Sequence, residues 1–128
     1  MTQGLTSACF CGAVRLELTG APNVQAYCHC GSCRGWLGAP IHGATLWPTP
    51  NVKVIAGADE LVTFTKTEAS HRQFCRRCGS PVRIVHRASW GKGQGPGRRS
   101  DIGGGRALRR GVVVSLETQR MTTRPFWQ

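Results

Sequence analysis

Three cysteines stand within a single short stretch, Tyr27-Cys28-His29-Cys30-Gly31-Ser32-Cys33-Arg34. Three thiols cannot all pair with one another as disulfides, so the triplet either takes a thiol from elsewhere or binds a metal ion. A zinc ion held by three protein ligands keeps a fourth position for water or substrate, as catalytic zinc does and structural zinc does not. The C-x-C-x-x-C spacing therefore makes Cys28, Cys30 and Cys33 candidate ligands of a catalytic-type zinc.

The other four cysteines form two pairs, Cys9 with Cys11 and Cys75 with Cys78. Each pair is a two-thiol knuckle beside a predicted strand, and the second is followed by Gly79, which is free to adopt positive φ. Together the two knuckles would close a tetrahedral four-cysteine site of the structural kind. The sequence thus predicts two zinc ions per chain, one structural and one of the catalytic type.

The triplet has an alternative interpretation as a second structural site that a histidine closes, since sites of three cysteines and one histidine are common. The chain offers His29, His42, His71 and His86. His29 is a poor candidate because it lies between two ligands and should point away from them in an extended segment.

The cysteine spacings are interpreted here as those of reduced thiols. No basic region or apolar run of a signal peptide follows Met1, so we expect a cytoplasmic protein in which zinc ligands are favoured over disulfides. No apolar run approaches the length of a membrane span, so we expect no membrane partner.

Short strands are the elements that must position these thiols. Residues 13–19 alternate apolar and polar side chains with a period of two, which predicts a half-buried strand. Further strand-like runs are separated by turns rich in Gly and Pro, and they cover residues 23–27, 41–47, 52–55, 61–65, 71–74 and 81–86. No segment shows a helical apolar stripe. We therefore expect residues 1–86 to form one mainly β domain without helices.

The character of the chain changes after His86. Residues 87–128 carry nine Lys or Arg against two acidic residues, whereas residues 1–86 carry eight against four. This basic Gly/Arg-rich tail is expected to be disordered apart from one strand at 112–116. A basic tail of this kind could bind nucleic acid through phosphates, although it contains too few aromatic residues for base stacking.

Three segments together resemble one known family. They are Cys9-Phe10-Cys11-Gly12-Ala13-Val14, the triplet stretch with Gly38-Ala39-Pro40, and Arg72-Gln73-Phe74-Cys75-Arg76-Arg77-Cys78-Gly79-Ser80-Pro81. In order and spacing they resemble the glutathione-dependent formaldehyde-activating enzyme (GFA) family, which includes the centromere protein V group. The resemblance covers residues 8–86.

The resemblance implies a zinc-stapled β-tent domain with a structural zinc on Cys9, Cys11, Cys75 and Cys78 and a catalytic-type zinc on Cys28, Cys30 and Cys33. It also implies carbon–sulfur lyase chemistry, in which glutathione adds to formaldehyde to give S-hydroxymethylglutathione. Family members usually continue beyond the equivalent of residue 86 with a Leu-Asp-Asp-Pro-like turn and further strands. That continuation is missing here, which suggests that residues 87–128 are a frameshifted or otherwise non-homologous tail, a hypothesis that translation of the gene in its other frames would test.

The residues leave the substrate open within the class of small thiols and aldehydes. Arg34, beside the triplet, is either a contact for a substrate carboxylate or a solvated surface residue. Ser70 and His71 stand before the second knuckle and remain unassigned. The alternative function is a non-catalytic zinc module whose basic tail binds nucleic acid or a protein partner.

Overall fold

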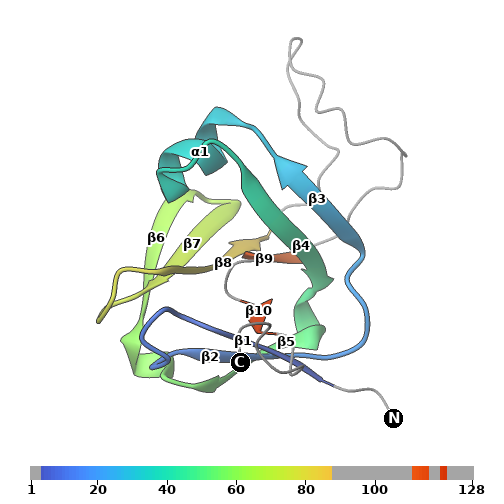
Figure 1. The fold of residues 1–128 in the computed structure, drawn as a ribbon, viewed down its shortest axis with the longest axis vertical. Helices are drawn as coiled ribbons and strands as arrows, with labels where there is room; N and C mark the ends of the chain where they lie inside the picture. The colour runs from blue at the N-terminus through green and yellow to red at the C-terminus, as the bar shows by residue number, and fades with distance from the viewer. Residues whose placement is uncertain (1–3, 88–110, 116–118, 121–128) are drawn as a thin grey trace, which may run out of the picture.

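The structure, a computed structural model, describes residues 4–87, 111–115 and 119–120. Most of the predicted tail, residues 88–110, 116–118 and 121–128, therefore lies outside the described residues. The described part of the chain forms two antiparallel β-sheets with one short α-helix (Figure 1).

The smaller sheet has four strands and lies at the bottom of the view in Figure 1. In spatial order its strands are β10 (Gln119–Arg120), β1 (Leu5–Ala8), β2 (Arg15–Leu18) and β5 (Val52–Ala56).

The larger sheet has six strands. In spatial order they are β3 (Val24–Cys28), β4 (His42–Pro48), β9 (Gly111–Ser115), β8 (Pro81–His86), β7 (Ser70–Cys75) and β6 (Leu61–Thr67). The helix α1 (Gly31–Leu37) connects β3 to β4, and two 3₁₀ turns, η1 (Thr49–Asn51) and η2 (Ala58–Glu60), flank β5.

The hydrophobic core lies where the two sheets pack together. Leu16 and Leu18 of β2 are fully buried in one cluster with Trp47 of β4 and with Val112 and Val114 of β9. Burying this much apolar surface is the main favourable contribution to folding. The Trp47 indole N–H donates to Thr45 Oγ1 at 2.8 Å, and the Thr45 hydroxyl donates to the Val114 carbonyl at 3.2 Å. The polar atom of the largest core side chain is therefore satisfied.

The mainly β class is confirmed, and the strand predicted at 112–116 is present as β9. β9 pairs with β4 on one side and β8 on the other, so it is an interior strand of the larger sheet. A domain boundary after residue 86 stays a prediction, but the larger sheet takes one of its strands from beyond that point.

The expectation that residues 1–86 contain no helix is wrong. Gly31 and Gly35 lower the helix propensity of α1, and no apolar stripe marks it, so the segment has the appearance of a loop. The helix begins because the Cys30 sulfur accepts a hydrogen bond from the Cys33 N–H at 3.3 Å and caps the first turn. Cys30, a candidate zinc ligand, thus also has a structural role.

Candidate metal centres and the adjoining cavity

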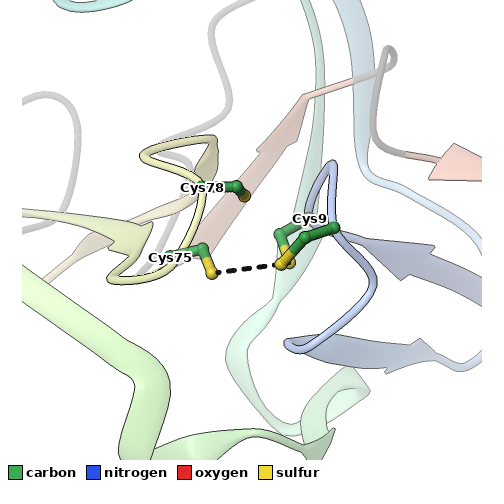
Figure 2. Close-up of side chains that lie close together, drawn as sticks. Cys9, Cys75 and Cys78 are labelled. Atoms are coloured by element: carbon green, nitrogen blue, oxygen red, sulfur yellow. Dashed lines mark hydrogen bonds between the residues drawn. The ribbon is translucent and has the colours of Figure 1, made fainter.

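Two loops bring Cys9, Cys11, Cys75 and Cys78 together. One loop joins β1 to β2 and the other joins β7 to β8, and Figure 2 shows the labelled side chains of Cys9, Cys75 and Cys78 converging. Gly12 and Gly79, with φ of +78° and +71°, end the two turns in a conformation that glycine adopts without strain. The cluster therefore connects the first hairpin of the smaller sheet to a strand junction of the larger one.

The sulfur geometry of this cluster fits a tetrahedral metal ion. The four sulfur atoms all lie within 4.8 Å of one another. Cys9 Sγ lies 3.6 Å from Cys11 Sγ, which lies 3.8 Å from Cys75 Sγ. Zinc–sulfur bonds of about 2.3 Å in a tetrahedron place the sulfurs about 3.8 Å apart. The four thiols therefore fit the zinc that their spacing predicted.

The pKa values of two thiols in this cluster are shifted in opposite directions. Burial raises the pKa of Cys78, but backbone hydrogen bonds at Cys11 and Ser80 and the neighbouring thiols outweigh burial and bring the pKa to about 6. A backbone hydrogen bond at Ala13 lowers the pKa of Cys11, but burial and the three neighbouring sulfurs raise it to about 11. Four thiolates this close repel one another strongly. A bound divalent cation would relieve that repulsion.

The second cluster is formed by the end of β3 and the start of α1. The sulfur atoms of Cys28, Cys30 and Cys33 lie within 4.8 Å of one another. Burial and the neighbouring thiols raise the pKa of Cys33 to about 12. Burial also raises the pKa of Cys30, but the Cys33 N–H and the adjacent thiols outweigh it and lower the pKa overall. This donor set also fits zinc, with three thiolates and one position not taken by these cysteines.

In the described part of the chain, no fourth Cys, His, Asp or Glu atom lies within 4.8 Å of all three sulfurs. Of the histidines considered as a closing ligand, His29 is exposed, as expected. His71 contacts Thr65 Oγ1 through Nδ1 at 3.2 Å and the Glu68 carbonyl through Nε2 at 3.0 Å. His42 and His86 line the same cavity as the three cysteines. Among the described residues the cluster therefore consists of three candidate ligands, and the three-ligand interpretation stays a prediction.

A cavity of about 340 Å³ adjoins the three-cysteine cluster. The opposite edge strands of the larger sheet, β3 and β6, both contribute to its lining, so the sheet curves around it. Figure 1 shows α1 at the top of the view, close to the upper ends of β6 and β7 and connected to β3 and β4. The apolar part of the lining consists of Val24, Ala26, Ala44, Leu46, Ile84 and Val113. This volume is in the range of small-molecule sites.

Arg72 is one of the polar residues of this cavity that the sequence analysis did not single out. Its side chain is only 5% exposed, and its Nη2 donates to Ser32 Oγ at 2.7 Å. The guanidinium lies over the Trp36 ring, 5.6 Å from the ring centroid. Lys66 Nζ donates to the same Ser32 oxygen at 2.7 Å, so two cations approach one neutral hydroxyl next to the thiols. No local pattern marks Arg72, because its strand neighbours are polar on both sides.

Arg34 lies elsewhere. It is exposed on α1 and, with Gly31, Gly35, Gly38, Ala39 and Pro40, lines a separate surface depression rather than the cavity of the three cysteines. Its role as a substrate contact stays a prediction. Of the two residues left unassigned, Ser70 lines the cavity, whereas His71 is not among the lining residues.

The described residues form a small two-sheet β fold with two candidate metal sites, one of four cysteines and one of three. The family model of the glutathione-dependent formaldehyde-activating enzyme matches residues 4–93, and the chain belongs to this family. A crystal structure of a Rhodobacter sphaeroides protein has the same fold, with a TM-score of 0.57 and 22% sequence identity over 94% of this chain and 91% of that one.

Two expectations from the sequence concern a membrane and nucleic acid as partners. No helix in the described part of the chain combines the length and the hydropathy that crossing a membrane requires. The nucleic-acid alternative depends on the basic tail, most of whose Lys and Arg residues lie outside the described residues.

Proposed function

We propose that this chain is a zinc-dependent carbon–sulfur lyase-type enzyme that adds a thiol such as glutathione to an aldehyde such as formaldehyde. The observation that carries the proposal is the convergence of Cys28, Cys30 and Cys33 beside a cavity, with no fourth protein ligand among the described residues. Membership of the family supports the reaction class. In the same proposal, Cys9, Cys11, Cys75 and Cys78 hold a structural zinc.

Zinc bound by the three thiolates would supply an exchangeable position at which a thiol is favoured in its deprotonated form. In the net reaction, the S–H bond and the carbonyl π bond break, and a carbon–sulfur bond forms. The thiol proton ends on the carbonyl oxygen, which becomes a hydroxyl group. Nothing is oxidised or reduced. The chain's own residues therefore have to hold two small molecules in contact and relay one proton.

The cavity is suited to both tasks. Its walls are mostly apolar, and apolar surroundings strengthen electrostatic interactions between the reacting groups. Ser70 and His86 line it and carry groups that can relay a proton. Burial, and then the nearby charge of Arg72, lower the pKa of His86, so its imidazole is neutral at pH 7 and able to accept a proton.

The test is formation of S-hydroxymethylglutathione by the zinc-loaded full-length protein. Because the uncatalysed addition also proceeds, the rate should be measured by exchange NMR with and without protein. We expect Cys30→Ser to reduce the rate to that of the uncatalysed reaction while the four-cysteine cluster keeps its metal. Equal rates for the wild type and Cys30→Ser would remove the catalytic role of the triplet.

A further inference from the structure

One side chain stands out in the row of residues that crosses the cavity face of the larger sheet. Cross-strand pairing places Val24, Leu46, Val113, Ile84 and Arg72 side by side, in that order, on β3, β4, β9, β8 and β7. All five line the cavity. A single buried cation thus continues an otherwise apolar row.

The Arg72 guanidinium is held in place but is only partly satisfied. Nη2 donates to Ser32 Oγ, and the Trp36 ring supports the group. Arg72 Nε and Nη1 are buried without a hydrogen-bond partner among the described residues, and so is the hydroxyl oxygen of Ser70, which lines the same cavity. A buried charge without a counter-charge is costly, and it is normally found paired. No salt bridge involves Arg72 in the described part of the chain.

We propose that Arg72 is the binding residue for a carboxylate on the thiol substrate. Arginine suits this ligand because its planar guanidinium presents several N–H donors to a carboxylate. Ser32 connects the guanidinium to the helix that Cys30 caps and that contains Cys33, so the carboxylate lies close to the reacting sulfur. Lys66, whose Nζ donates to the same Ser32 oxygen, adds a second positive charge at this wall. The inference rests on the proposed function for the identity of the reacting group.

The experiment compares two thiols of equal shape, 3-mercaptopropionate and its neutral amide, 3-mercaptopropionamide. Binding to the full-length zinc-loaded protein is measured by calorimetry without aldehyde. We expect the wild type to bind the carboxylate about 10- to 100-fold more tightly than the amide, as charge-assisted hydrogen bonds allow. Arg72→Met should abolish this preference, whereas Arg72→Lys should retain part of it.

Arg15→Met is the matched control, because it removes an exposed arginine on β2 of the smaller sheet, outside the cavity, and should leave the preference unchanged. A preference that survives Arg72→Met, or that is absent from the wild type, overturns the proposal. Zinc content is measured in the same variant. If Arg72→Met loses one zinc ion, and the molecules that keep both zinc ions still prefer the carboxylate, the proposal is also overturned, because Arg72 would then only balance the thiolate charge.

The melting temperature keeps the test independent of folding. Removing an unpaired buried charge should leave the ligand-free melting temperature unchanged or higher, so a large decrease for both Arg72 variants would show a structural role and contradict the proposal. Selective binding without turnover would refute the proposed function and leave the carboxylate site standing. Turnover without a preference for the carboxylate would refute the carboxylate site and leave the proposed function standing.

Discussion

β9 provides a direct test of whether the chain beyond residue 86 belongs to the fold. Val112 and Val114 of β9 are 1% and 0% exposed and pack in the core, whereas Val113 lies on the opposite face and lines the cavity. Substituting each valine with alanine removes the same two methyl groups from the same strand. The three variants therefore differ only in where those methyl groups are buried.

For Val114→Ala, two methyl groups contribute about 0.8 kcal/mol each by transfer, and the cavity left behind adds to this. The expected loss is about 2–3 kcal/mol of the free energy of unfolding. For a domain of this size that corresponds to roughly 8–12 °C in melting temperature. Val112→Ala should behave in the same way, and the partly buried Val113→Ala should lose about 1 kcal/mol or less.

Urea denaturation followed by tryptophan fluorescence measures these differences, since Trp47 lies in the same core cluster. A tail that takes no part in the fold would make all three substitutions neutral within about 0.5 kcal/mol, as surface changes usually are. That result would contradict the sheet pairing of β9 and favour an independent tail. Equal, large losses for all three valines would contradict the two-faced geometry of the strand.

Two further predictions concern the clusters and the cavity. Cys75→Ser should lower the melting temperature far more than Cys30→Ser, because Cys75 is fully buried between the sheets while Cys30 is exposed. Calorimetry with metal analysis measures the difference. Equal effects would contradict the structural role of the four-cysteine cluster. The pKa of His86, lowered by burial and by Arg72, should rise in Arg72→Met when followed by NMR. Because the folded state disfavours the imidazolium, His86 should cost stability only as the pH falls below its unfolded value of about 6.5. The other charged or titratable groups lining its cavity are Lys66, His42, Cys28, Cys30 and Cys33.

The sequence predicted the parts of the site that are local in the chain. The thiol pairs and the triplet could be read from spacing alone, because a knuckle of two or three residues fixes where its sulfurs point. The strand at 81–86 was predicted with its observed bounds, since it is an apolar run closed by turns. The short strand Leu5–Ala8 was not predicted, and its buried Ser7 shows why: four residues give no clear alternation.

What depends on long-range pairing could not be predicted. Arg72 acquires its surroundings from Ile84 on β8 and from Trp36 and Ser32 on α1, none of which is near it in sequence. The interior place of β9 likewise depends on its pairing with β4 and β8. A run of valines predicts a strand but not the neighbours between which the strand lies.

β7 connects the two thiol clusters physically. It begins at Ser70, continues through Arg72 on the cavity face, and ends at Cys75 in the four-cysteine cluster. The Arg72 guanidinium then contacts Ser32, between two cysteines of the triplet. Fixing Cys75 therefore fixes the register of the strand that presents Arg72, because a one-residue slip would turn the arginine to the other face of the sheet. The four-cysteine cluster is thus expected to set the geometry of the cavity as well as the stability of the fold.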